Sequence, residues 1–282
     1  MGLPTTSEIL KETDRTVREQ GRAGLCQVVR TEGSTPGKPG WKLLVRTDGT
    51  AYGNLGGGAF EALVKTDIEE KLKSAKPEFE IKRYYLTETA TRGEATGMVC
   101  GGFAEVFLEV LEAKPLLIVC GGGPVGQALA HNAVLCDFDV VVTDDREEFR
   151  RPERFPEGIE IVAVTREHDE EFLSAYSRRT LYVAVVSRCW DTDLAALASV
   201  LRQRPKRLAY LGLMGSQRKV EKVVEQLKAR NLDLPEKEFR APIGMAIGGD
   251  QPGEIAVSIL AEMIQVRSET AVSVHRSVAD IA

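Results

Sequence analysis

The segment LLIVCGGGPVG, residues 116–126, constrains the fold of this 282-residue chain more than any other. An apolar run is followed at once by glycines in the pattern Gly121-x-Gly123-x-x-Gly126, and then by a helical sequence. Glycines at this spacing let a backbone turn tightly, approach a pyrophosphate and pack a helix against a strand. Asp144 ends the next apolar run, where an acid that binds a ribose is expected. In the alternative interpretation the glycines only close a strand–helix turn and Asp144 only caps a strand.

Four more apolar runs follow, and amphipathic segments lie between several of them. This alternation predicts an α/β fold in which the C-terminal part is a Rossmann-like, doubly wound parallel sheet. The five runs are LLIVCG, VVVTDD, IEIVAV, TLYVAVV and LAYLGLMG. A last helix is expected to start near Pro252, and its continuous apolar face is a candidate homodimer interface.

The sequence before Lys114-Pro115 predicts a smaller N-terminal α/β domain. A capping box of Thr5 and Glu8 starts its first helix, and Gly21 ends that helix. Strand-like runs and a second helix over residues 59–75 follow. We therefore place the domains at residues 1–113 and 114–282.

Composition excludes several classes of protein. The formal net charge is −5, which argues against a protein that coats nucleic acid. No run of about 18 apolar residues exists, so no membrane span is expected. The five cysteines are an odd number without a CxxC pair, and the N-terminus has no apolar core typical of a signal peptide. We expect reduced thiols and a cytoplasmic protein.

A second glycine run, GNLGGG, ends in Gly56, Gly57 and Gly58 just before the helix of residues 59–75. Successive glycine N–H groups can form a concave site for a phosphate or another oxyanion. Glu61 lies one turn into that helix. It either interacts with the helix dipole or binds a polar ligand, and its spacing favours the dipole role.

Two further motifs could carry chemistry. Cys100 stands beside Gly101 and Gly102, and a cysteine in such a turn is either an accessible ligand for a soft metal or a small buried residue. In the segment GSQRK, Ser216 can cap a helix whose first turn contains Arg218 and Lys219. Cations there oppose the helix dipole, so a nearby anionic partner is expected.

Together these segments resemble the XdhC/CoxI family, which comprises accessory proteins of molybdenum hydroxylases such as xanthine dehydrogenase. The resemblance rests on GSTPGKPGWKLLVRTDGTAYGNLGGGAFEA, GMVCGGFAEVFLE, LLIVCGGGPVGQALA, YLGLMGSQRKVEKV and APIGMAIGGDQPGEIAVSILAEMIQVR. It covers nearly the whole chain in the family's order.

The resemblance implies a carrier that binds the molybdenum cofactor (molybdopterin), protects it, and assists its sulfuration and delivery. The implied partners are a molybdenum hydroxylase and a cysteine desulfurase. Its motifs place cofactor-binding positions at the glycines and acid of the second glycine run, at the CGG segment and at Ser216 and Arg218, with Cys100 as the metal ligand. We therefore expect an insertion chaperone without turnover of its own.

The sequence departs from the family pattern at two places. Ala59 stands where many members carry Cys or His, so a role resting on a side chain there is absent. The segment after the fourth strand of the C-terminal sheet reads SRCWDTD, without the family's histidine, although Asp193 matches its aspartate. Cys189 in this segment is an alternative soft ligand.

Two alternatives to the chaperone follow from the same residues. An NAD(P)-dependent oxidoreductase is supported by the glycine fingerprint and Asp144, and an acid at that position favours NAD. Against it, no proton donor of the His–carboxylate kind is assembled in the sequence. The third interpretation is a scaffold that only docks a desulfurase or the target enzyme.

Overall fold

The computed structural model describes residues 3–74, 78–86, 94–95, 102–164 and 172–268. The chain divides into two compact units, Met1–Ala113 and Lys114–Ala282. Each unit has its own sheet and its own buried clusters. Among the described residues, no helix is both long and apolar enough to cross a membrane.

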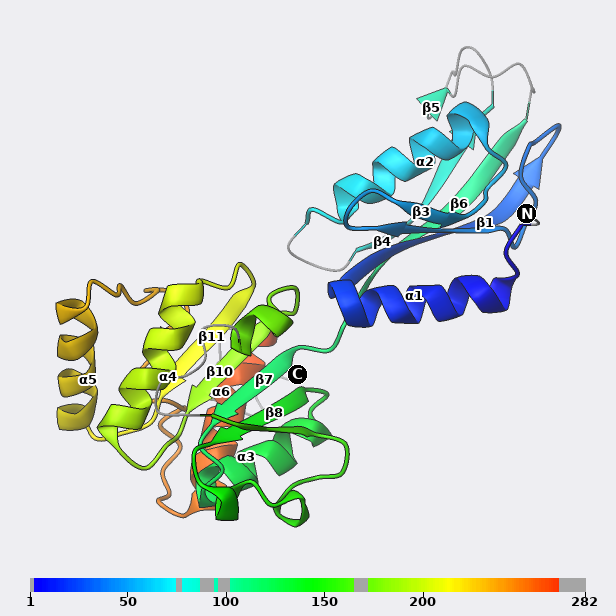
Figure 1. The fold of residues 1–282 in the computed structure, drawn as a ribbon. Helices are drawn as coiled ribbons and strands as arrows, with labels where there is room; N and C mark the ends of the chain where they lie inside the picture. Colours follow the sequence, from blue (N-terminus) through cyan, green and yellow to red (C-terminus); the bar gives the residue numbers. More distant parts are fainter. Residues whose placement is uncertain (1–2, 75–77, 87–93, 96–101, 165–171, 269–282) are drawn as a thin grey trace, which may run out of the picture. The chain divides into compact units, whose positions relative to one another are not determined.

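The first unit is a six-stranded sheet of order β3-β2-β1-β6-β4-β5, with α1 against one face and α2 against the other (Figure 1). All neighbouring strands are antiparallel except β4 and β5. Its elements are α1 (Thr6–Gln20), β1 (Arg22–Glu32), β2 (Lys42–Arg46), β3 (Ala51–Gly53), α2 (Gly58–Lys71), β4 (Phe79–Tyr85), β5 (Glu94–Ala95) and β6 (Phe103–Glu112).

Local signals explain where these helices begin and end. Thr5 caps α1 in a capping box with Glu8, and Gly21 ends the helix with a left-handed φ of 78°, as the sequence predicts. On α2, Phe60, Val64 and Ile68 recur at helical spacing and are fully buried against the sheet.

The second unit is a six-stranded parallel sheet of order β12-β11-β10-β7-β8-β9. Counted from β7, this is the 3-2-1-4-5-6 order of a Rossmann fold. The prediction of a doubly wound parallel sheet is therefore confirmed. Its elements are β7 (Leu116–Cys120), α3 (Pro124–Leu135), β8 (Asp139–Asp144), β9 (Glu160–Ala163), β10 (Leu181–Val185), α4 (Trp190–Gln203), β11 (Leu208–Leu213), α5 (Gln217–Ala229), β12 (Phe239–Arg240) and α6 (Pro252–Ser268), with 3-10 turns at Glu147–Phe149, Pro152–Arg154 and Phe172–Tyr176.

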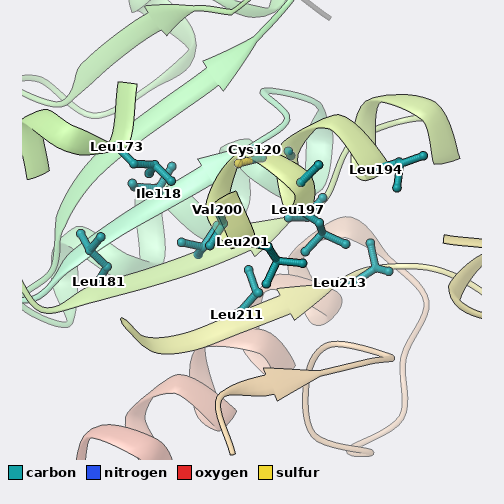
Figure 2. Packing of buried hydrophobic residues seen from close by; sticks show 14 of the residues in the cluster. Ile118, Cys120, Leu173, Leu181, Leu194, Leu197, Val200, Leu201, Leu211 and Leu213 are labelled. Carbon is teal, nitrogen blue, oxygen red and sulfur yellow. The ribbon is translucent and has the colours of Figure 1, made fainter. Parts of the chain in front are cut away.

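Helices cover both faces of the parallel sheet. On one face α4 and α5 pack on the central strands, and Leu197, Leu211 and Leu213 belong to that cluster (Figure 2). On the other face, α3 and α6 pack on the sheet and on each other. Because both faces are buried, β7 and β10 are apolar along their whole length.

The last helix does not leave its apolar face free. Ile259 and Met263 of α6 are fully buried in the cluster shared with α3. The face that the sequence offers as a homodimer interface is therefore used inside the unit, because it covers one side of the sheet.

Candidate functional site

The three glycines of the fingerprint differ in whether the fold requires glycine at their position. Gly121 ends β7 with a left-handed φ of 125°, and its N–H donates to the Thr143 carbonyl at 2.8 Å. A Cβ on Gly126 would lie 1.8 Å from the Gly121 carbonyl oxygen, so only glycine lets α3 approach β7 this closely. Gly123 has an ordinary φ of −68°, and a Cβ there would meet nothing within 4 Å. The fold itself does not require glycine at Gly123.

Gly123 is also the N-cap of α3, and no side chain caps this helix. Pro124 follows in the first turn, where its missing N–H costs nothing. An uncapped helix N-terminus combines unpaired N–H groups with the positive end of the helix dipole. The open space beside Gly123 therefore suits an anionic group of a ligand.

Asp144 ends β8 beside this turn and is held by three groups of the chain itself. The Gly122 N–H donates to Oδ2 at 2.8 Å, and the Arg146 guanidinium donates to both carboxylate oxygens at 3.0 Å. The Arg146 N–H also donates to Oδ1, at 3.0 Å. Burial alone would raise the pKa of Asp144, but these hydrogen bonds outweigh burial and hold the pKa below its usual value.

A solvent-open hollow lies between the ends of β7, β8 and β10 and the start of α4. Arg188 follows β10 and pairs with Asp145 at 3.0 Å, while Arg146 follows β8 and stacks on the Phe149 ring at 3.7 Å. Two guanidinium groups therefore line this hollow. It is the place where doubly wound sheets bind their ligands, because the strand order reverses between β7 and β10.

The GSQRK segment is tied to α4 by a buried ion pair. Ser216 caps α5 as predicted, and its hydroxyl accepts from the Lys219 N–H at 3.4 Å. The Lys219 ammonium reaches the Asp193 carboxylate at 2.5 Å and the Met214 carbonyl at 3.0 Å. Asp193 is fully buried, and burial outweighs its contacts with Lys219 and Ser187, so its pKa is raised. The anion expected near Lys219 is thus a carboxylate of the protein.

Arg218 and Cys189 differ in how far their side chains are exposed to solvent. Arg218 is exposed, and no hydrogen bond or ion pair joins it to another residue that the structure describes. Cys189 is the N-cap of α4 and half-buried, with its sulfur 3.3 Å from the Thr192 hydroxyl. Cys120 is buried beside the hollow, and burial raises its pKa to about 12, so this thiol stays protonated at neutral pH.

In the first unit, the second glycine run is filled by side chains of its own segment. Gly56, Gly57 and Gly58 all have left-handed φ angles. The Glu61 carboxylate accepts from the N–H groups of Leu55 at 2.7 Å and Gly57 at 3.3 Å. The neighbouring Gly56 N–H donates to the Asn54 side chain at 2.5 Å. Glu61 therefore serves the loop as an internal anion, a role that its spacing alone did not reveal.

Two other motif segments of the first unit pack nearby: the GSTPGKPG loop contacts the glycine run, and Gly102 contacts the start of that loop. A Cβ on Gly37 would lie 2.1 Å from the Leu55 carbonyl oxygen, so the GSTPGKPG loop packs directly against the run. A Cβ on Gly102 would lie 2.3 Å from the Glu32 oxygen and 2.8 Å from the Ser34 oxygen. Cys100 and Gly101 lie outside the described residues, and Ala59 is exposed in the first turn of α2.

Two further residues contribute to the hollow and belong to none of the sequence motifs. At the hollow, Arg146 binds Asp144 and Ser187 binds Asp193. Each lies two residues beyond the carboxyl end of a strand, and that position was the signal available in the sequence. Within the described ranges, no three His, Cys, Asp or Glu side chains form a group that could hold a metal ion.

Fold and site define this class of protein: a Rossmann domain with an uncapped helix N-terminus and two arginines at its carboxyl edge, preceded by an α/β unit. A family model described as the XdhC Rossmann domain matches residues 117–263, and one described as the XdhC and CoxI family matches residues 16–85. The chain belongs to the XdhC and CoxI family.

Two curated relatives align with much of the chain. It is 34% identical over 250 residues to a protein of Escherichia coli (strain K12) named "Uncharacterized protein YqeB", and the match covers 86% of this chain and 43% of that protein. It is 32% identical over 168 residues to a probable xanthine dehydrogenase subunit of Bacillus subtilis (strain 168), and the match covers 59% of this chain and 47% of that protein. The chain thus spans less than half the length of these relatives.

A crystal structure described as a xanthine dehydrogenase from Bacillus halodurans aligns with 96% of this chain and 98% of its own. Its sequence identity is 20% and its TM-score is 0.46.

Proposed function

We propose that this chain is an accessory protein of a xanthine dehydrogenase-like molybdenum hydroxylase, and that it carries the molybdenum cofactor, assists its sulfuration and inserts it into that enzyme. The observation that carries the proposal is family membership, with matches in both units. The relative named as a probable xanthine dehydrogenase subunit indicates which kind of enzyme is served. A cysteine desulfurase is the partner that sulfuration requires.

The Rossmann unit offers the better place for an anionic cargo such as molybdopterin, which carries a phosphate. At the second glycine run, the N–H groups of Leu55, Gly56 and Gly57 already have acceptors. At α3, by contrast, no side chain caps the helix, and the space beside Gly123 is open. Arg218 on α5 has no partner among the described residues and supplies positive charge that a phosphate needs, while Arg146 and Arg188 at the hollow share their guanidinium groups with Asp144 and Asp145.

Sulfur chemistry is assigned to Cys100, with Cys189 as the second thiol. The molybdenum centre of the bound cargo would supply an acceptor for a soft thiolate ligand. Cys120 does not suit this role, because its raised pKa keeps the thiol protonated.

The test is to purify the protein from a host that makes the cofactor. Molybdenum is measured by elemental analysis, and pterin by the fluorescence of its oxidised form. Both should co-purify with the chain. If neither does, and the apo-protein takes up no cofactor added anaerobically, the carrier function is wrong. Cys100→Ser with Cys136→Ser as control tests the thiol role alone, and unchanged loading of Cys100→Ser would remove only that role.

Gly123→Asp tests the place of the cargo. Asp is a good N-cap, so α3 should keep or slightly gain stability, while the new carboxylate occupies the anion site. We expect pterin loading to fall at least about tenfold, which corresponds to about 1.4 kcal/mol. Gly253→Asp is the matched control, because Gly253 also lies at the start of a helix with open space around it. Unchanged loading of Gly123→Asp would place the cargo elsewhere.

The second candidate is an NAD(P)-dependent oxidoreductase, which the 3-2-1-4-5-6 strand order and the position of Asp144 favour. A ribose would have to share the Asp144 carboxylate with Arg146 and the Gly122 N–H. Titration of NADH and NADPH against protein fluorescence separates the two functions. Tight binding of either nucleotide, without bound molybdenum or pterin, would favour the oxidoreductase.

A further inference from the structure

Over residues 79–83, strand β4 pairs with a described strand on one side only. On one side it pairs with β6 along its whole length, in the register Phe79↔Glu109 to Tyr85↔Phe103. On the other side, β5 pairs only with Tyr84 and Tyr85. Within the described part of the chain, no strand pairs with residues 79–83 on that side.

The alternation of hydrogen bonds between β4 and β6 shows which residues of β4 direct their backbone groups toward the unpaired side. The Val110 N–H donates to the Glu78 carbonyl and the Leu86 N–H donates to the Gly102 carbonyl, both across to the β6 side. Because bonding alternates along an antiparallel pair, the even-numbered residues of β4 bond to β6. Phe79, Ile81 and Arg83 therefore direct their N–H and C=O groups outward.

The same odd-numbered residues place apolar side chains on an uncovered face. Phe79 is 78% exposed and Ile81 is 63% exposed. They lie on the face of the sheet opposite α2, and α1 on that face packs on β1 and β2. Phe79 contacts Phe107 of β6, with ring centroids 6.4 Å apart. Exposed apolar residues on an unpaired edge favour pairing with another strand.

Among the described residues, the lysine of this edge strand does not protect the edge. A lysine on an edge strand normally keeps other strands away. The Lys82 ammonium, however, is drawn onto its own unit, 3.0 Å from the Asp67 carboxylate. Glu80 is likewise held by Lys71 of α2 at 2.7 Å. Both charged side chains therefore lie on the α2 side of the sheet and leave the backbone edge accessible.

The segment FEIKR is complementary to itself when it is read antiparallel. With Ile81 opposite the second copy's Ile81, each Glu80 faces a Lys82 and each Phe79 faces an Arg83. Opposite charges and an aromatic–cation pair at directly opposed positions stabilise a sheet. Arg83 lies over the Phe103 ring at 4.4 Å and pairs with Glu105 of β6 at 2.5 Å, so its guanidinium is on the same face as Phe79.

We propose that two copies of this chain form a dimer by antiparallel pairing of β4 with β4, about a two-fold axis at Ile81. The pairing joins the two N-terminal sheets into one, and each outward-facing residue exchanges backbone hydrogen bonds with its opposite residue. The occupant is a second copy because the segment is complementary to itself about Ile81, with Glu80 opposite Lys82 and Phe79 opposite Arg83.

Charge exchange on the full-length protein tests the pairing. Glu80→Lys places lysine opposite lysine, and Lys82→Glu places glutamate opposite glutamate. Each single variant should raise the dimer dissociation constant at least about tenfold, measured by sedimentation equilibrium. A mixture of the two variants restores opposite charges at every position and should form a one-to-one heterodimer. The double variant Glu80→Lys/Lys82→Glu should again form a homodimer.

Ile81→Lys and a matched control complete the test. Ile81→Lys should give a monomer with the circular dichroism spectrum of the parent. Ile247→Lys, at an exposed apolar residue of the other unit, should leave the dimer unchanged. The proposal is overturned if the parent chain is monomeric at high micromolar concentration, if Ile81→Lys stays dimeric, or if the mixed single variants fail to associate.

Discussion

Asp144 shows how one carboxylate can serve the fold at the place where a ligand is expected. Its oxygens accept from Gly122 and Arg146, and its side chain is almost fully buried. These bonds join the glycine turn after β7 to the end of β8. Asp144 therefore stabilises the shape of the ligand crevice whether or not a nucleotide binds there.

This role predicts a pH dependence of stability. Because the folded state holds the pKa of Asp144 below its ordinary value of about 3.9, the carboxylate stabilises the fold fully above that value. The stabilisation is lost as the pH falls through the folded-state pKa. Asp144→Asn should lower the free energy of unfolding by about 2 kcal/mol at pH 7. The gap between variant and parent should shrink below about pH 4.

Urea unfolding at a series of pH values checks this prediction. Asp145→Asn is the control, since it removes a carboxylate from the same edge that pairs with Arg188 and is less buried. Its effect should be smaller. A gap between Asp144→Asn and the parent that stays constant or widens in acid would contradict the assigned role.

At the scale of elements, the start of α2 depends on a residue inside the helix. The N-cap residue Gly57 has no side chain that could cap the helix. The Glu61 carboxylate instead accepts hydrogen bonds from the Leu55 and Gly57 N–H groups. Glu61→Ala should lower the free energy of unfolding by about 2 kcal/mol, because it leaves backbone donors unpaired. Glu61→Gln should lower it less, because an amide oxygen can still accept.

Chemical denaturation and pterin loading together decide between the two roles of Glu61. Glu69→Ala on the same helix is the control, since its contact with Lys65 is a surface pair at 3.5 Å. If Glu61→Ala were as stable as the parent while its pterin loading fell, Glu61 would bind the ligand and not the loop.

The elements with local signals were predictable from the sequence. The capping box at Thr5, the glycine turn at Gly121 and the β-branched runs of the parallel sheet are each contained in a few consecutive residues. Strands β5 and β12 have only two residues each, too short for any periodicity, and the sequence did not reveal them.

Contacts between distant segments were not predictable in the same way. The Asp193–Lys219 pair joins two helices, and neither residue type identifies its partner. The spacing of Glu61 predicts only a dipole or ligand role, since its contact with the preceding loop depends on three left-handed glycines in a row. Such contacts arise from the fold, and the spacing of residues along the sequence does not identify them.

At the scale of the whole molecule, the buried clusters divide between the two units. Two clusters lie within the first unit and two within the second, and none of them mixes described residues of both. Domains with separate cores can unfold separately. We therefore expect a substitution in one core to shift the unfolding of its own unit and to leave the other unchanged.

The two tryptophans make this prediction measurable. Trp41 packs on a core cluster of the first unit, and Trp190 begins α4 in the second. Trp41→Phe leaves fluorescence from the second unit alone, and Trp190→Phe leaves fluorescence from the first. Gly126→Ala forces a Cβ to within 1.8 Å of the Gly121 oxygen, so it should destabilise the second unit by about 2 kcal/mol. In the Trp41→Phe background the urea midpoint should fall. In the Trp190→Phe background it should stay at the parent value, and an equal fall in both backgrounds would show that the two units unfold as one.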